Sequence, residues 1–351
     1  MALSSCITTY LLVNPVNLST RQPTIPPTGK HLLFNMGILS SIFGNSKPTP
    51  ESQYETLRDD GVRAMQMGEA AYAEKCLKAA LDIKRELRTV SFLAEVYLRM
   101  QNYEQALPLL QEISTSDEDT LEVDLLLAQT QGKLGQYANE RETCQRITQQ
   151  HADEPRALYL MAEADHGLHD DFMAIAHLTQ CLTLRSDYEQ ALFLRANVLK
   201  GMSQWNEVLT DAESLVKADA ENTDYLLLRA EAYAALSKTD EAIADLKQVQ
   251  VLNPFCDDAI LKLGSIYQQT AQWDKALALY NEAIEQRPDF AAAYKARGAV
   301  KNHLKDVAGA AEDLKRSLEL DPDKGKSLDG EYTNIENEMN DRYKRMNPYG
   351  F

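Results

Sequence analysis

The sequence predicts an all-α protein built as a solenoid of antiparallel helix pairs, and two observations support this. Gly and Pro number only 15 and 12 among 351 residues, while Ala, Leu, Glu, Lys and Gln are abundant, which is typical of helices. A pattern of apolar and small residues also repeats every 34 residues from Leu87 to Pro322, after a 33-residue copy that starts at Tyr54. Eight such copies predict eight stacked helix pairs, because one pair cannot bury its own apolar face.

The first helix of each copy is predicted from a column that holds only the two smallest residues. This small column consists of Gly61, Ala94, Ala128, Ala162, Ala196, Ala230, Gly264 and Gly298. In one copy, Ile260, Gly264 and Tyr267 have the i, i+4, i+7 spacing of a single helix face. Small residues at the centre of that face let two helix backbones approach closely.

The second helix of each copy is predicted from a later pair of columns. One is small in most copies and consists of Ala73, Ala106, Glu140, Ala174, Val208, Ala242, Ala276 and Ala310; the other is mainly large and apolar and includes Leu77, Leu110, Leu178, Leu246, Tyr280 and Leu314. Residues that disfavour helix stand within the copies at Gly68, Gly135 and Ser237 and between them at Pro254, Pro288 and Pro322. Each copy therefore reads as a helical hairpin.

The copy from Leu121 to Glu154 departs from this pattern. Asp124, Gln131 and Glu140 occupy positions that are apolar or small elsewhere. We expect looser packing there than in the neighbouring copies.

These columns resemble the tetratricopeptide repeat family. The stretches "IYQQTAQWDKALALYNEAIEQRP" and "AAYKARGAVKNHLKDVAGAAEDLKRSLELDP" carry its small, aromatic and terminal-proline positions, and the resemblance covers residues 54–322. It implies a right-handed superhelix whose inner face holds an extended peptide or a helix of a partner protein. Some relatives bind acidic chaperone tails through a Lys/Asn/Arg clamp across two adjacent first helices, and the matching combination is missing here because Ala299, not Asn, follows Lys295 by one turn.

The two ends of the chain differ from the repeats that fill residues 51–322. Residues 1–50 lack acidic residues, and we interpret them either as an upstream extension before a start at Met36 or as an organelle transit peptide. Residues 323–346 carry an apolar stripe that predicts a C-terminal capping helix, with docking to another protein as the alternative. Residues 347–351 form a tail.

A binding surface is predicted on the first helices, one residue beyond the large apolar column, which the superhelix would place on the inner side. Large apolar residues occupy this row in five consecutive copies: Leu125, Tyr159, Phe193, Leu227 and Leu261. In one interpretation these side chains form a ladder that contacts a ligand, with Tyr159 and Phe193 as central anchors. In the other they pack into the space between adjacent first helices. Polar residues lie beside the row at Glu163, Asn197, Lys200 and Glu231, and Asn197 with Lys200 has the chemistry to hold a peptide amide and a carboxylate.

The predicted function is therefore a protein-protein interaction scaffold or adaptor. The alternative is a membrane-associated assembly factor or co-chaperone tethered through residues 36–45, the only segment for which we consider membrane association. A net charge of −17 disfavours nucleic acid as a partner, and five scattered cysteines point to a reducing, cytoplasmic setting. Organelle targeting is the alternative location.

Neither an enzyme nor a cofactor is predicted. The phosphate loop GxxxxGK, the zinc helix HExxH and the GxSxG elbow are all missing from the sequence. The densest cluster of metal-ligating types, around His166, His169, Asp170, Asp171 and His177, spreads over both helices and the turn of one copy, so we expect no metal site there. Cys144 and Cys181 stand in core columns, where cysteine behaves as a small hydrophobe.

Overall fold

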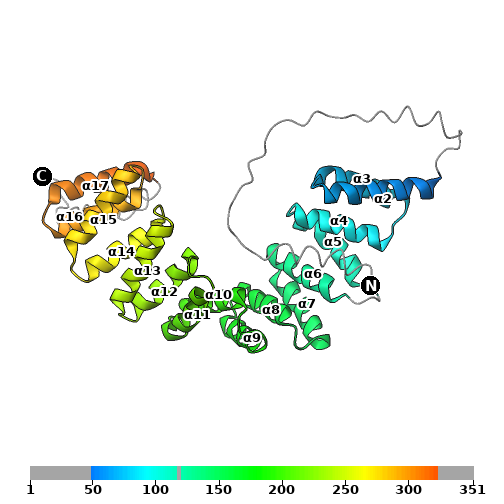
Figure 1. Cartoon of the computed structure of the whole chain (residues 1–351), viewed down its shortest axis with the longest axis horizontal. Coiled ribbons are helices and arrows are strands. Elements are labelled where there is room, and N and C mark those ends of the chain that lie inside the picture. The colour runs from blue at the N-terminus through cyan, green and yellow to red at the C-terminus, as the bar shows by residue number, and fades with distance from the viewer. Residues whose placement is uncertain (1–48, 117–119, 323–351) are drawn as a thin grey trace, which may run out of the picture. The chain divides into compact units, whose positions relative to one another are not determined.

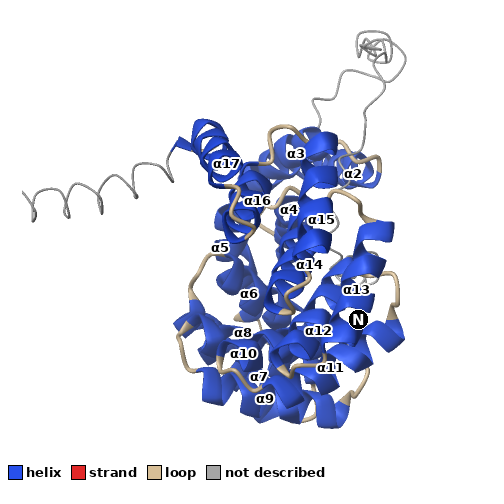
Figure 2. Cartoon of the chain, turned by 90° about the vertical axis from the view of Figure 1, so that its left-hand side faces the viewer, coloured by secondary structure: helices blue, strands red, loops and turns tan. Residues whose placement is uncertain are grey.

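The computed structural model describes residues 49–116 and 120–322, and every helix in these ranges is an α-helix, with no strand among them (Figure 2). The first helices of the successive pairs are α2 (Pro50–Gln66), α4 (Leu87–Arg99), α6 (Leu121–Lys133), α8 (Pro155–Gly167), α10 (Glu189–Gly201), α12 (Thr223–Ala235), α14 (Asp257–Gln269) and α16 (Ala291–His303). The second helices are α3 (Ala70–Ile83), α5 (Tyr103–Ser114), α7 (Tyr137–Gln150), α9 (Asp171–Leu184), α11 (Trp205–Ala218), α13 (Thr239–Leu252), α15 (Trp273–Gln286) and α17 (Val307–Leu320).

The helices belong to two compact units, and the boundary along the chain falls between Ser186 and Asp187. The first unit contains α2–α9 and the second contains α10–α17 (Figure 1). Within each unit, every helix packs against the next one along the chain, and several first helices also touch each other, as α14 and α16 do. From α4 onward each first helix begins 34 residues after the previous one. This confirms the predicted all-α solenoid of antiparallel helix pairs.

The small column lies where the two helices of a pair are in closest contact. A Cβ added to Gly61 would lie 2.7 Å from the side chain of Leu77 on α3, so the glycine makes room for the leucine. The large late-column residues are buried at Leu77, Leu110, Leu178, Leu246 and Tyr280. Leu314 is an exception to the expected core, because it is 45% exposed on α17, the last helix of the described chain.

The turn inside each pair has the same backbone conformation throughout. Glycine takes the left-handed region at Gly68 and Gly135, and other residue types take it at φ between 55° and 69° at Gln101, His169, Ser203, Ser237, Ala271 and Lys305. A non-glycine residue is strained in this region because its Cβ crowds the backbone. Asn102 and Asp170, each next to such a residue, accept hydrogen bonds from backbone N–H groups in the first turn of the second helix, which helps to start it.

Three pairs in the second unit are joined by a bidentate ion pair between a partly exposed arginine and a buried aspartate, which the sequence pattern did not reveal. In each, a first-helix arginine donates from Nε and Nη2 to both carboxylate oxygens of an aspartate sixteen residues later, at 2.6–2.8 Å. The pairs are Arg195–Asp211, Arg229–Asp245 and Arg297–Asp313. In the pair α14–α15 the equivalent positions hold Leu263 and Leu279, so the solenoid accepts either kind of contact.

The divergent pair α6–α7 accommodates most of its polar residues with specific partners. Asp124 accepts hydrogen bonds from Thr120 at 3.1 Å and from Arg146 at 2.7 Å, and Gln131 accepts one from Thr143 at 2.9 Å. Glu140 differs, because it is 0% exposed and neither carboxylate oxygen has a hydrogen-bond partner. The departure from the repeat pattern is therefore costly at Glu140, where a carboxyl group is buried alone.

The leader of residues 1–50, apart from its last two residues, lies outside the described residues, and so do Met36, the segment 36–45, the capping helix of residues 323–346 and the tail of residues 347–351. In the ranges that are described, none of the helices has the length and apolar character needed to cross a membrane.

Candidate peptide-binding groove

The predicted apolar row is present in the second unit as three half-buried side chains. Phe193, Leu227 and Leu261 occupy equivalent positions on α10, α12 and α14. Leu227 and Leu261 pack against the hydrophobic core of the unit while keeping part of their surface exposed. The Phe193 ring lies 5.7 Å from the Tyr225 ring, tilted by 48°. Partly exposed, well-supported apolar side chains of this kind are typical of interaction surfaces.

Tyr225 is a member of this surface that sequence reasoning missed. The equivalent positions of the neighbouring copies hold Ala191 and Ala259, so the tyrosine departs from the repeat pattern. Its hydroxyl donates a hydrogen bond to Glu189 at 3.2 Å. Burial and the negative charge of Glu189 raise the pKa of Tyr225 to about 12, so the hydroxyl stays protonated at neutral pH.

The polar residues beside the row are already engaged within the chain. The Asn197 side-chain amide donates to the Phe193 carbonyl of its own helix at 2.8 Å. Lys200 and Lys262 lie 3.1 Å and 2.7 Å from the two carboxylate oxygens of Glu231. Burial raises the pKa of Glu231, but the two lysines outweigh it and hold that pKa below its usual value. A ligand carboxylate would therefore compete with Glu231 for Lys200. That Asn197 and Lys200 bind a peptide remains a prediction.

Lys262 also departs from its column. Its counterparts Leu160, Leu194 and Leu228 are apolar. An alignment of the repeats with one another therefore marks Lys262 as an unusual residue at its position. The lysine links α14 to α12 through Glu231. The three charged groups place one net positive charge on this part of the surface.

In the first unit the predicted row is less open. Leu125 is 4% exposed and belongs to a core cluster that includes Cys144, Ile147 and Met161. Tyr159 is half-buried against the same cluster, and Glu163 lies 3.9 Å from Lys133. At Leu125 the side chain therefore fills a seam between helices, the second of the two roles expected for this row, because neighbouring helices cover it.

A cleft opens in the second unit beside Leu261. It has a volume of about 460 Å³, within the range of about 300–1,000 Å³ common to ligand pockets. Leu261, Ser265 and Gln268 of α14 line it opposite Ala292, Lys295, Ala296 and Ala299 of α16. The predicted residue Leu261 thus borders a cavity, and Ala292 and Ala296 of α16 are functional candidates that the repeat pattern did not predict.

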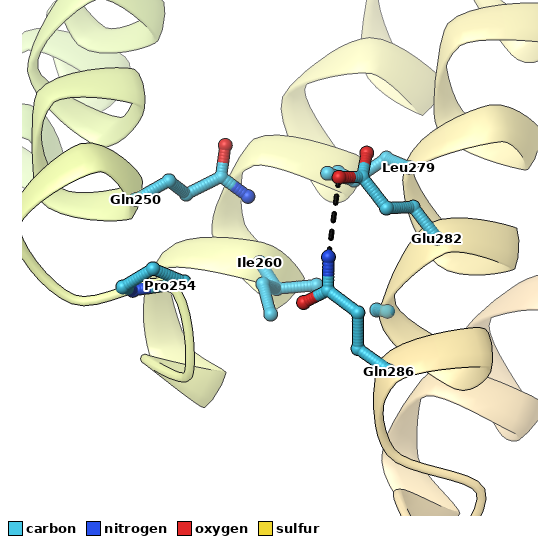
Figure 3. A pocket seen from close by; sticks show the side chains of 7 residues that line it. Gln250, Pro254, Ile260, Leu279, Glu282 and Gln286 are labelled. Carbon is cyan, nitrogen blue, oxygen red and sulfur yellow. Dashed lines mark hydrogen bonds between the residues drawn. The ribbon is translucent and has the colours of Figure 1, made fainter.

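A smaller cleft of about 120 Å³ lies between the second helices α13 and α15, beside Ile260 of α14 (Figure 3). Gln286 faces Glu282 there and donates to it at 3.3 Å, as the dashed line in Figure 3 shows. Gln250 faces them across the opening. This cleft is too small for more than a few atoms of a ligand, so the larger cleft is the stronger candidate.

The histidine-rich stretch of the first unit forms two separate pairs. His166 lies 2.6 Å from Asp171, and His177 lies 2.6 Å from Asp165, which also contacts Arg141 at 3.3 Å. His169 stands in the turn between the two helices. Within residues 49–116 and 120–322, no three His, Cys, Asp or Glu side chains form a group that fits a metal ion. Cys144 and Cys181 are buried, as expected for core positions, and the Cys181 thiol donates to the Pro155 carbonyl at 3.2 Å.

Comparisons with known proteins agree with this architecture. The sequence model of the tetratricopeptide repeat family matches residues 93–155, 193–255 and 261–324, which together exceed half of the chain. No curated protein matches the chain.

Two solved structures illustrate the likeness. A tetratricopeptide repeat protein from Parabacteroides merdae ATCC 43184 is 16% identical over 71% of this chain and 98% of its own, with a TM-score of 0.52. YrrB, a tetratricopeptide repeat protein with an unusual peptide-binding site, is 20% identical over 55% of this chain and 99% of its own, with a TM-score of 0.44. At these identities the first structure supports the fold alone. With the family's sequence model matching more than half of its length, the chain belongs to the tetratricopeptide repeat family.

Proposed function

We infer that this protein is a protein-protein interaction scaffold that binds an extended peptide or a helix of a partner on the first-helix surface of its second unit. The observation that carries this inference is the row of half-buried Phe193, Leu227 and Leu261, which ends at a cleft of about 460 Å³. A row of apolar anchors on successive helices suits a chain-like ligand, since one ligand side chain can meet each helix in turn.

Affinity and register come from different parts of this surface. The apolar row supplies affinity, because its exposed carbon surface leaves water on binding. The charged group formed by Lys200, Glu231 and Lys262 supplies register, since a misplaced ligand would bury charges without partners. Binding at such a surface involves no chemical step. The protein acts by holding these side chains in fixed positions for the partner.

The test uses peptides selected from a random 12-residue phage library on the immobilised full-length chain. Selected peptides are synthesised and their dissociation constants measured by fluorescence anisotropy. We expect Phe193→Ala to weaken binding by more than about 10-fold, since truncation of a central aromatic residue commonly costs about 2 kcal/mol. Leu227→Ala should weaken the same peptides to a smaller extent.

Phe172→Ala is the matched control, because Phe172 is also an aromatic residue but is 75% exposed on the second helix α9. It should leave binding unchanged. The proposal is wrong if the library yields no peptide above background, or if the selected peptides bind Phe193→Ala as tightly as the unmodified chain.

A further inference from the structure

One wall of the cleft beside Leu261 is α16, which is the first helix of the final pair. At the position of Ala296, four earlier first helices carry Leu126, Leu160, Leu194 and Leu228. The column of Ala292 holds Arg88, Glu122 and Arg156 in earlier copies, and that of Ala299 holds Glu95, Glu163 and Glu231. Three alanines on one face of α16 thus stand where most other copies carry a larger side chain.

The residues around the cleft indicate what fits it. Leu261 and the alanines give an apolar wall, and Gln268, the polar group beside it, already donates to the Tyr280 hydroxyl at 3.1 Å. The exposed ammonium group of Lys295 borders the cleft on α16. Lys295 has no ion-pair or hydrogen-bond partner among the residues that the structure describes, whereas Lys262 on the facing helix is paired with Glu231. The ammonium group of Lys295 therefore stands beside a mainly apolar cavity, whose lining also includes the Ser317 hydroxyl and the Asp321 carboxylate of the last helix pair.

We propose that this cleft is the specificity pocket of the peptide-binding surface, and that it takes a large apolar side chain, such as leucine, methionine or phenylalanine, from a partner peptide with an acidic residue next to it. This inference rests on the proposed function and deepens it. The apolar side chain replaces the volume that Ala292, Ala296 and Ala299 leave open. The adjacent carboxylate pairs with Lys295, which fixes the direction in which the peptide runs.

The decisive variant is Ala296→Leu, which fills the cleft with the residue that four other copies carry and so is compatible with the fold. Random 12-residue phage libraries are selected in parallel on the full-length chain and on this variant. Peptides from the unmodified chain should share a large apolar residue beside Asp or Glu, and peptides from Ala296→Leu should lack this pair. Synthetic peptides from the first selection should bind Ala296→Leu at least about 10-fold more weakly.

Two further variants separate the roles of volume and charge. Ala278→Leu adds the same side chain at an exposed position of α15 and should not change binding. Lys295→Gln should weaken a peptide with Asp next to its apolar anchor, but should not weaken the same peptide with Asn there. Equal weakening of both peptides would overturn the pairing with Lys295.

The outcomes distinguish this inference from the proposed function. Peptides that need Phe193 but bind Ala296→Leu unchanged would leave the first-helix surface in place and refute the pocket. Unchanged binding together with faster hydrogen exchange of residues 323–351 in Ala296→Leu would show that the chain's own C-terminal segment uses the cleft, and would also refute the proposal. An unfolding midpoint measured for each variant verifies that the fold is intact.

Discussion

Gly264 leaves room for Tyr280: a Cβ added to the glycine would lie 2.1 Å from the tyrosine hydroxyl oxygen. The small column and the late apolar column meet at this contact, and here the smallest residue faces the largest. In other pairs the equivalent positions hold alanine and leucine, as at Ala162 and Leu178 or at Ala230 and Leu246. The two columns therefore share a limited volume between them.

This relationship predicts that Gly264→Ala lowers the free energy of unfolding by about 1–3 kcal/mol, the usual cost of overpacking a core. The double variant Gly264→Ala/Tyr280→Leu should recover most of the loss, because it recreates the alanine and leucine of other pairs. Urea denaturation followed by circular dichroism measures both effects. A double variant no more stable than Gly264→Ala would show that the two columns are not coupled.

Glu140 predicts a specific dependence of stability on pH. Burial, together with the nearby negative charge of Glu163, raises the pKa of Glu140 to about 9. The folded chain thus keeps a proton that the unfolded chain releases near pH 4.5. The free energy of unfolding should fall as pH rises from about 4.5 to about 9, with a loss of about 3 kcal/mol reached at pH 7.

Glu140→Gln should remove this slope and raise stability at neutral pH, because the glutamine has no charged form to favour unfolding. The measurement is the free energy of unfolding in urea at several values between about pH 5 and about pH 9. Glu142→Gln, at an exposed position of the same helix, is the control and should leave the slope unchanged. A slope as steep in Glu140→Gln as in the unmodified chain would mean that Glu140 does not hold a proton in the folded protein.

The strained turns predict a stabilising substitution. Ala271 has a φ of 56°, where alanine is disfavoured by about 1 kcal/mol and glycine is not. Ala271→Gly should therefore raise the thermal midpoint, as measured by circular dichroism. The same change at Ala278, within α15, should lower it, since glycine in a helix interior costs about 1 kcal/mol relative to alanine. Effects of the same sign would contradict the turn geometry.

The bidentate ion pair between Arg229 and Asp245 predicts a non-additive response. Asp245→Leu should destabilise the chain by about 1–3 kcal/mol, because it leaves the half-buried Arg229 guanidinium without its carboxylate partner. Arg229→Leu/Asp245→Leu should be close to neutral, since Leu263 and Leu279 occupy these positions in the next pair. Urea unfolding of Arg229→Leu, Asp245→Leu and the double variant completes the cycle. Additive losses would show that the arginine and the aspartate act independently.

The repeat pattern predicted the fold well because the same residue types recur at the same positions in many copies, so one unusual residue does not hide the pattern. The small column and the 34-residue period located the helix pairs, and the breaks at Gly68, Gly135 and Ser237 fall in left-handed turns. The exposure of individual side chains was harder to predict. Leu125 and Leu261 share one column, yet Leu125 is buried and Leu261 borders a cleft, because the residues that surround each position differ.

The sequence by itself determined the class of this protein, since an apolar period of 34 residues can be buried only by stacking helix pairs. Tertiary structure alone decided which polar groups find partners and where a cavity remains. The pairing of Glu231 with Lys200 and Lys262, and the solitary burial of Glu140, depend on side chains from several helices. Such contacts form across helices, where the spacing of residues along the chain does not specify distance.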